Sequence, residues 1–255
     1  MTGRENPMKN NNPKVVIIMP AYNAAKTLNM TYVQIPEGIT DEVILVDDAS
    51  KDETTEVAKK LNLKVITHPH NVGYGGNQKT CYMEALREKA DIVIMLHPDG
   101  QYDPTVLPHL IEPIKNGEAD MVLGSRMLIK GKALEGKMPL YKFIANKSLT
   151  MIENLVFNTK FSECHTGYRA YSRKFLETVP FLRNSNDFVF DTEIIAQAIY
   201  FKFKVAEVPV TTKYFKEASS VNFKVSVIYG IKTLITLLKY ILHNLGIIKC
   251  PLFRP

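Results

Sequence analysis

Short apolar runs recur through the first half of the chain and are separated by amphipathic segments. Rich in Val, Ile, Leu and Met, the runs cover residues 15–19, 43–46, 63–67, 92–96 and 121–123. Their apolar residues follow one another without regular polar alternation, which is typical of parallel strands buried on both faces of a sheet. We therefore expect five strands of a parallel sheet in this half.

The segments between these runs carry apolar residues at helical spacing. They predict helices over residues 52–61, 76–89 and 104–116. Asp52 is a candidate cap of the first helix, and Asp103 is the expected N-cap of the third, with Pro104 at its first position. Strands that alternate with helices in this way indicate right-handed βαβ crossovers and a doubly wound α/β sheet.

The pattern changes after Gly124. Residues 127–140 are rich in Gly and Lys and are interpreted as a mobile loop, and residues 163–171 as polar turns. Helical spacing returns over residues 141–157 and 191–201, and a late strand is expected over residues 205–210.

The composition limits the classes of protein to which the chain can belong. Its 255 residues, 45% of them apolar, suffice for one large α/β domain or two small ones. A formal net charge of +6 favours anionic partners, but the lysines are scattered and form no basic stripe, so we expect no nucleic acid. The three cysteines share no CxxC spacing, which disfavours a disulfide framework or a zinc site.

The N-terminal residues and the lengths of the apolar runs bear on whether the chain carries a signal peptide or a transmembrane helix. Residues 1–13 are polar and Asn-rich, and are interpreted as a disordered lead-in rather than a signal peptide. The chain has no run of 18 or more uncharged apolar residues, so we expect no conventional transmembrane helix.

Polar and small residues follow three of the apolar runs. PAYN (20–23) ends the first run, VDDAS (46–50) the second, and HPDG (97–100) the fourth. Ligands of open α/β sheets bind beyond the carboxyl ends of the strands, so Asp99 at such an end indicates a nucleotide or metal–phosphate site. Asp47 and Asp48 are candidate ligand contacts, with turn formation and helix capping as the alternative.

The segment HNVGYGG (70–76) lies between the third run and a predicted helix. Its glycines would let the backbone approach a phosphate, since a helix N-terminus favours anions. Turn formation explains the same residues equally well, because the spacing matches neither a P-loop nor GxGxxG. His68 and His70 lack further ligands at metal-site spacing and are interpreted as loop residues.

Seven motifs taken together resemble the family 2 glycosyltransferases of the GT-A fold. They occur in the family's order: PAYN (20–23), VDDAS (46–50), NVGYGG (71–76), HPDGQYDP (97–104), GSR (124–126), TGYRAYSR (166–173) and EVPV (207–210). The chain is most similar to the dolichyl- and polyprenyl-phosphate sugar synthases. The resemblance implies a Rossmann-like, mostly parallel sheet flanked by helices over residues 14–220. Residues 221–255 then form a C-terminal amphipathic helix and tail.

The resemblance assigns the donor nucleotide to residues at the strand ends. The implied contacts are Pro20, Ala21, Tyr22, Asn23, Asp47, Asp48, Gly75, Gly76, Lys79, His97, Pro98 and Asp99. Asp99 matches the family carboxylate that helps to hold Mg²⁺ or Mn²⁺ on the donor diphosphate. His97 stands where the family usually has aspartate, and would serve as a softer metal ligand that suits Mn²⁺ or as a ribose contact. The family often has Glu at the position of Ala24 and Gly at that of Ala49.

Four further residues are implied in catalysis. Arg126 and Arg169 would grip phosphates, because a guanidinium pairs bidentately with phosphate oxygens, and a surface ion pair is the alternative for each. Asp191 is the leading candidate for a general base, with Glu193 beside it, and helix capping is the alternative for Asp191. An acceptor phosphate would need no base, because its second pKa is about 6.

The C-terminal segment has two unlike sides at helical spacing. The apolar side consists of Val227, Ile228, Ile231, Leu234, Ile235, Leu238, Ile241, Leu242 and Leu245. The other side carries polar residues such as Thr233, Thr236 and His243. Lys232 and Lys239 disfavour a span across a bilayer. The apolar side therefore predicts an interfacial helix on anionic lipid, packing against the catalytic domain, or a homodimer contact, and the resemblance favours the membrane.

These features together predict an enzyme, a hexosyltransferase. It would move a sugar with inversion from a UDP- or GDP-linked donor to a polyprenyl or dolichyl phosphate at the cytoplasmic membrane surface. A saccharide hydroxyl as acceptor would require Asp191 or Glu193 as base. Two other classes stay open: a non-catalytic nucleotide-sugar binding module, which His97 and Ala24 motivate, and a nucleotidyltransferase, although the sequence after the first strand lacks a triphosphate loop.

Overall fold

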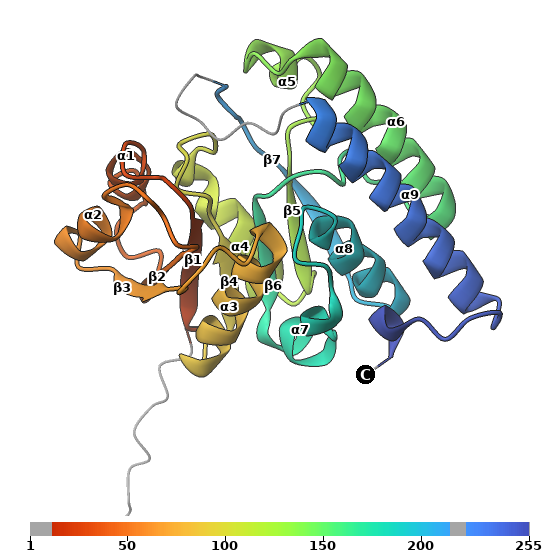
Figure 1. The fold of residues 1–255 in the computed structure, drawn as a ribbon, viewed down its shortest axis with the longest axis horizontal. Helices are drawn as coiled ribbons and strands as arrows, with labels where there is room; N and C mark the ends of the chain where they lie inside the picture. The colour runs from red at the N-terminus through yellow and green to blue at the C-terminus, as the bar shows by residue number, and fades with distance from the viewer. Residues whose placement is uncertain (1–11, 215–222, 255) are drawn as a thin grey trace, which may run out of the picture.

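A seven-stranded sheet forms the centre of the molecule in a computed structural model that describes residues 12–214 and 223–254 (Figure 1). Its strand order is β3-β2-β1-β4-β6-β5-β7. The strands are β1 (Val15–Ala21), β2 (Glu42–Asp47), β3 (Lys64–Thr67), β4 (Ile92–Met95), β5 (Met121–Ser125), β6 (Arg169–Ser172) and β7 (Val205–Pro209). The five strands predicted in the first half and the late strand are therefore confirmed. The expected lead-in over residues 1–13 lies, except for its last two residues, outside the described residues.

Strand β6 corrects the interpretation of residues 163–171 as turns only. It pairs antiparallel with both β4 and β5, whereas β1–β2, β1–β4, β2–β3 and β5–β7 are parallel pairs. The strand has only four residues, and Arg169 and Ser172 at its ends interrupt any apolar run. Long-range pairing rather than a local pattern therefore defines it.

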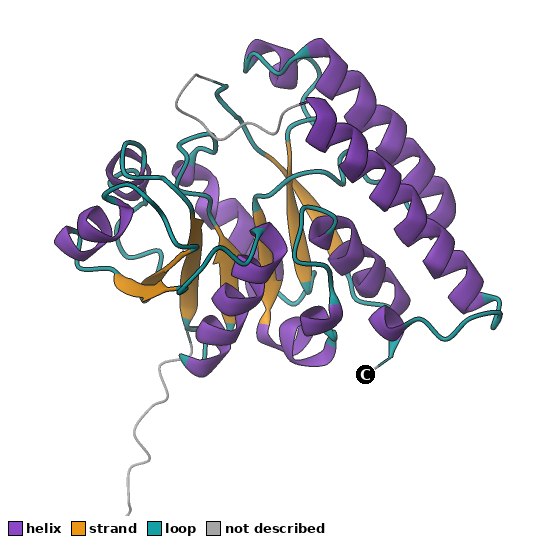
Figure 2. Ribbon diagram, viewed as in Figure 1, coloured by secondary structure: helices purple, strands orange, loops and turns teal. Residues whose placement is uncertain are grey.

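Helices cover both faces of the sheet (Figure 2). They are α1 (Leu28–Tyr32), α2 (Thr54–Lys60), α3 (Tyr74–Arg87), α4 (Leu107–Lys115), α5 (Lys132–Glu135), α6 (Leu140–Phe157), α7 (Arg173–Thr178), α8 (Phe190–Tyr200) and α9 (Phe223–Asn244), with 3₁₀ turns at Pro104–Val106, Phe181–Arg183 and Pro251–Phe253. Asp103 caps the turn before α4 as predicted, accepting from Thr105 N at 2.9 Å, and Asp52 accepts from Thr54 N at the start of α2. The segment 127–140, expected to be a loop, contains the short helix α5.

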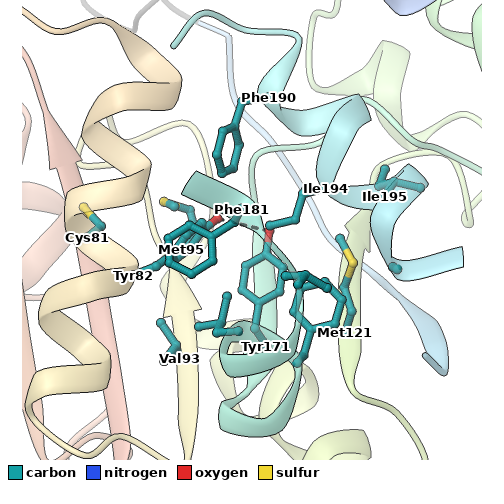
Figure 3. Close-up of a cluster of buried hydrophobic side chains, with 14 of the residues drawn as sticks. Cys81, Tyr82, Val93, Met95, Met121, Tyr171, Phe181, Phe190, Ile194 and Ile195 are labelled. Carbon is teal, nitrogen blue, oxygen red and sulfur yellow. Dashed lines mark hydrogen bonds between the residues drawn. The ribbon is translucent and has the colours of Figure 1, made fainter. Parts of the chain in front are cut away.

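Successive residues of β1 point into two different cores. Val16 and Ile18 join one apolar cluster with residues of α3 and α8, and Ile17 and Met19 join a second cluster with residues of α1, α2 and α4. In the first cluster the hydroxyls of Tyr82 and Tyr171 are 3.2 Å apart, so α3 is hydrogen-bonded to β6 inside the core (Figure 3). All three cysteines are buried free thiols.

Helices α6 and α9 lie side by side along one flank of the molecule (Figure 1). Their inward sides carry buried polar groups beside the apolar Phe157 and Leu237. On α9, Thr233 and Thr236 are buried, and Thr233 Oγ1 lies 3.2 Å from Thr192 Oγ1 of α8. On α6, Asn146 and Glu153 are buried. The polar groups therefore fasten these helices to the rest of the protein.

The apolar sides of the same two helices are exposed. They comprise Leu140, Tyr141, Ile144, Met151, Ile152 and Leu155 of α6 and Val227, Ile228, Ile231, Leu234, Ile235, Leu238 and Ile241 of α9, followed by Leu245, and are called the α6/α9 face below. The expectation that the apolar side of α9 could pack against the catalytic domain is thus wrong. Contiguous exposed apolar area of this kind marks an interaction surface.

The long α9 bears on the expectation that the chain has no conventional transmembrane helix. Its residues Lys224–Asn244, with a mean hydropathy of 1.6, are long and apolar enough to cross a membrane by length and composition. Soluble helices pass the same test, so this property alone assigns no span. Lys232, midway along α9, pairs with Asp187 of the loop before α8.

Candidate active site

A cavity of about 740 Å³ opens at the carboxyl ends of β1, β2 and β4 and extends to α6 and α9. Its wall at the strand ends includes the predicted contacts Pro20, Ala21, Tyr22, Asn23, Asp48, His97, Pro98 and Asp99. Arg126 and Asp191 line the same cavity. The structure thus brings together ten of the residues that the sequence places in a donor and catalytic site.

The PAYN and VDDAS segments are tied to each other by their own polar groups. Asn23 N donates to Ser50 Oγ and Lys51 N donates to Asn23 Oδ1, both at 2.8 Å. Asn23 itself adopts a left-handed backbone with a φ of 51°, which asparagine tolerates better than most residues. Tyr22, half exposed, therefore stands at the rim of the cavity on a cross-braced loop.

The two adjacent aspartates have different surroundings. Asp48 lines the cavity, but its carboxylate accepts from Val72 N at 2.8 Å and Gly73 N at 3.1 Å, and His68 Nδ1 lies 2.9 Å away. Asp47 is buried behind the wall and accepts from Ser50 N. Asp48 therefore stabilises the NVGYGG loop. This is a structural role of the kind that the sequence left open as the alternative to ligand contact.

The glycines of the NVGYGG segment serve close packing. A Cβ on Gly75 would lie 2.3 Å from the Ser185 carbonyl oxygen, so no larger residue fits there. Lys79 donates to Asn186 Oδ1 at 2.7 Å and to the Asn184 carbonyl. The structure thus places Gly75, Gly76 and Lys79 behind the cavity wall, where they join α3 to the loop before α8.

His97 and Asp99 stand together at the end of β4. The ring of His97 stacks on Tyr74 at a centroid distance of 5.7 Å, and a Cβ on Gly167 would lie 2.6 Å from His97 Nε2. Burial raises the pKa of Asp99 and lowers that of His97, and the charge of each opposes the shift of the other. Gln101 N donates to Asp99 Oδ1.

These two side chains fit a metal that is shared with a substrate. Within the described residues, no group of three or more His, Cys, Asp or Glu side chains could hold an ion alone. Mg²⁺ and similar ions commonly take one or two protein ligands and fill their other positions with substrate phosphates and water. A carboxylate beside an imidazole at the cavity wall matches that arrangement.

Asp191 is held by side chains of three other positions. Tyr74 Oη donates to Asp191 Oδ2 at 2.9 Å, Gln78 Nε2 donates to Oδ1 at 3.3 Å, and Arg169 Nη1 lies 3.5 Å from Oδ1. Burial, followed by the charge of Asp191, raises the pKa of Tyr74 well above its usual value, so its hydroxyl stays protonated. The helix-capping alternative for Asp191 is wrong, because its carboxylate points to these groups and Asp187 accepts from Val189 N instead.

Arg169 and Glu193 lie away from the cavity. Arg169, 1% exposed, donates to the carbonyl oxygens of Thr166, Asp191 and Cys164. Glu193 accepts from Ser185 N at 2.6 Å and from Ser185 Oγ at 2.8 Å. In this structure Arg169 orients Asp191, and Glu193 fixes the loop before α8.

Arg126 reaches the cavity from a buried ion pair. Its Nε donates to Glu163 Oε1 at 2.8 Å, its Nη1 to Tyr214 Oη at 2.7 Å and its Nη2 to the His165 carbonyl at 2.7 Å. Burial, followed by the charge of Arg126, lowers the pKa of Lys142, which lines the same end of the cavity. Lys142 and Arg126, whose charge Glu163 offsets, place nitrogen donors at this end of the cavity, which suits an anion.

Several of these residues were missed from the sequence. Tyr74 lies inside a quoted motif, but its hydroxyl matters only because α8 brings Asp191 to it. Lys142 and Tyr229 belong to segments without any motif and reach the cavity through the packing of α6 and α9, and Tyr214 reaches it from the segment after β7. A local pattern carries no signal for such residues.

Comparison with known proteins identifies the fold and the family. The chain is 30% identical to UDP-N-acetylglucosamine–dolichyl-phosphate N-acetylglucosaminyltransferase of Methanococcus voltae, over 78% of this chain and 86% of that one. It is 25% identical to undecaprenyl-phosphate mannosyltransferase of Micrococcus luteus, over 78% and 83%. The structure resembles glucosyl-3-phosphoglycerate synthase of Mycobacterium tuberculosis, crystallised with Mn²⁺, UDP and phosphoglyceric acid. The TM-score is 0.68 at 16% identity, over 89% of this chain and 78% of that one.

The family model for glycosyl transferase family 2 matches residues 16–179, a range that contains the strand-end motifs and the GSR and TGYRAYSR segments. The sheet order, the strand-end cavity and the similarity to solved structures agree with this match. The chain belongs to glycosyl transferase family 2 and has its GT-A fold.

Proposed function

We propose that the enzyme transfers a hexose with inversion from a UDP- or GDP-linked donor to a polyprenyl phosphate. The observation that carries the proposal is the extent of one cavity, which runs from the strand ends to α6 and α9, where Tyr141 of the α6/α9 face lines it. A donor nucleotide belongs at the strand ends. A lipid-borne phosphate would enter where Tyr141, Lys142 and Tyr229 of the two apolar-faced helices line the wall.

The donor end would be formed by the residues expected from the sequence. Tyr22 offers an aromatic ring for the base, and Asp48 and Asn23 present polar groups nearby. His97 and Asp99 would hold Mg²⁺ or Mn²⁺, which when bound neutralises the charge that develops on the departing nucleoside diphosphate. The mycobacterial synthase crystallised with Mn²⁺ and UDP supports a divalent metal for this fold.

The acceptor end favours a phosphate over a hydroxyl. Among the carboxylates that line the cavity, Asp191 is the base candidate that the sequence indicates, but both its oxygens already receive donors or lie beside a cation. A hydroxyl acceptor would have to displace one of these contacts to reach the carboxylate. A phosphate monoester needs no base, because it is already mostly ionised at neutral pH. The two relatives described above, both named for lipid-phosphate acceptors, support the same choice.

The α6/α9 face would rest on the cytoplasmic surface of a membrane that contains anionic lipid. Both helices of this face also carry lysines, which are Lys142 and Lys147 on α6 and Lys232 and Lys239 on α9. Apolar side chains with lysines beside them bind such interfaces through buried area and charge attraction. The phosphate of an embedded acceptor would then lie near the cations Lys142 and Arg126.

The test is a transfer assay with labelled UDP- and GDP-sugars, Mn²⁺ and a short-chain polyprenyl phosphate. We expect a lipid-linked sugar from one donor, no product from the matching polyprenol that lacks the phosphate, and loss of product in EDTA. Transfer to the polyprenol or to a saccharide instead would contradict the acceptor assignment. Tight binding of the nucleotide sugar without turnover would favour a binding module.

A further inference from the structure

Three ionisable side chains from different segments form a chain that ends at the cavity wall. Glu153 of α6 is fully buried, and its Oε2 lies 3.0 Å from Nε2 of His165, which precedes β6. The other ring nitrogen of His165, Nδ1, lies 2.6 Å from Oη of Tyr229 on α9. His165 and Tyr229 both line the cavity.

The surroundings of Glu153 and His165 indicate how this chain is protonated. A buried carboxylate is stable only with a compensating charge or several donors. Within the described residues neither oxygen of Glu153 has a partner with standard hydrogen-bond geometry. His165 is a neighbour that can carry a compensating charge, and the Cys164 thiol is a weaker donor beside the same carboxylate. The contacts of His165, with a carboxylate oxygen at Nε2 and a hydroxyl oxygen at Nδ1, fit a ring that donates from both nitrogens.

That protonation leaves the Tyr229 hydroxyl free to donate. If His165 Nδ1 donates to Tyr229 Oη, the hydrogen of the hydroxyl must point elsewhere. Thr192 Oγ1 is 3.3 Å away, at the long end of the range for a hydroxyl donor. Burial raises the pKa of Tyr229, so the hydroxyl keeps its proton. An anion in the cavity would be a better acceptor than Thr192.

The position of the chain shows which anion it would meet. Arg126 Nη2 donates to the carbonyl oxygen of His165, so Tyr229 belongs to the same end of the cavity as Arg126 and Lys142. We infer that Tyr229 is a hydrogen-bond donor to the phosphate of the acceptor and that Glu153 and His165 are positioning residues for its hydroxyl. This inference rests on the proposed function.

A purely structural role makes a different prediction, because the same contacts join α6, α8 and α9. Loss of a structural contact would lower the melting temperature and would impair kcat and both Michaelis constants together. Loss of an acceptor contact would raise only the KM for the acceptor. Tyr240 provides a matched control on α9, since it packs its ring against Phe157 and Phe253.

The experiment measures the full chain as wild type, Tyr229→Phe, Glu153→Gln and Tyr240→Phe. The readouts are kcat, the KM for the nucleotide sugar, the KM for a short-chain polyprenyl phosphate and the melting temperature. We expect Tyr229→Phe to raise the acceptor KM about tenfold or more, with kcat and the donor KM changed less than about twofold. Glu153→Gln should move the acceptor KM in the same direction, and Tyr240→Phe should leave it unchanged.

The outcomes separate this inference from the function on which it rests. Wild-type protein that transfers sugar to the polyprenyl phosphate, together with an unchanged acceptor KM in Tyr229→Phe, would overturn the inference alone. A parallel loss in kcat, both KM values and melting temperature would overturn it as well, in favour of the structural role. Wild-type protein without any transfer to polyprenyl phosphate would overturn the proposed function and the inference with it.

Discussion

At the scale of single residues, the site uses buried groups to aim a few exposed ones. Arg169 matches a motif that implied phosphate contact, yet it holds the backbone and side chain of Asp191 from behind. Asp48 likewise fixes a loop through the amides of Val72 and Gly73. The sequence could identify which positions matter at the site. It could not tell contact residues from their supports, because that depends on which way each side chain points.

Asp99 is the residue on which the donor end depends most. Asp99→Asn keeps the size of the side chain but removes the charge that would hold a divalent metal. We expect sugar-nucleotide turnover to fall by roughly 100-fold or more, measured as release of free nucleotide. Asp103→Asn is the matched control, because Asp103 caps the turn before α4 outside the cavity. Equal turnover in Asp99→Asn and wild type would count against the metal role.

Glu163 makes stability depend on pH. Burial alone would raise its pKa, but the charge of Arg126 and hydrogen bonds from Arg126 and Asn146 outweigh burial and hold the pKa below the usual value. The stabilisation is therefore complete above about pH 4.5 and is lost as the pH falls through the lowered pKa. Glu163→Gln should cost roughly 3 kcal/mol at neutral pH, because Arg126 stays buried without a counter-charge.

Thermal unfolding between pH 3 and pH 7 tests this dependence on Glu163. The gap in melting temperature between wild type and Glu163→Gln should be widest near neutrality and should narrow in acid. Glu118→Gln, at an exposed position, serves as control and should follow the wild-type curve. A gap that stays constant over the whole range would argue against the ion pair as its source.

At the scale of elements, the local sequence pattern predicted those strands and helix caps that local sequence determines. The apolar runs located six strands, and the cap at Asp103 is confirmed, whereas α2 has Glu53 rather than Asp52 at its N-cap position. Strand β6 escaped detection because its four residues, with Arg169 and Ser172 at the ends, form no apolar run, so only its pairing with β4 and β5 defines it. The two sides of α9 were recognised from the sequence, but which side faces inward depends on polar partners such as Thr192 on α8.

The apolar sides of α6 and α9 supply the prediction for this scale. Ile231→Asn combined with Leu238→Asn replaces two side chains that are 55% and 54% exposed. We expect binding to vesicles of anionic lipid to weaken by at least about tenfold, since each buried CH₂ contributes about 0.8 kcal/mol. Cosedimentation measures the binding, and the melting temperature should change little.

Val33→Asn is the control for the double variant of α9. Val33 is 65% exposed at the end of α1, away from both helices. It should leave vesicle binding unchanged. If the double variant bound vesicles as tightly as wild type, or if it lost a homodimer in solution instead, the face would serve protein contact rather than lipid.

At the scale of the whole molecule, the position of α9 bears on whether this helix crosses a membrane. It is long enough to cross a membrane, yet Thr233 and Thr236 pack inside the protein and Lys232 pairs with Asp187. These polar contacts would be lost if the helix left the domain. We therefore expect alkaline carbonate to release the chain from membranes that carry it. Retention of the chain in the membrane pellet would indicate a spanning helix.

The inward polar sides of α6 and α9 also bear on how the protein tolerates mutation. In most globular proteins the interior accepts one apolar residue for another, while the surface varies freely in charge. Along this flank the rule is reversed in part, because several inner positions require particular hydrogen-bonding groups beside the apolar Phe157 and Leu237, whereas the outer positions need only apolar volume. Natural variants should therefore interchange Leu, Ile, Met and Phe readily on the outer sides of α6 and α9. The inner residues Asn146, Glu153 and Thr233, and Thr192 of α8, should vary little.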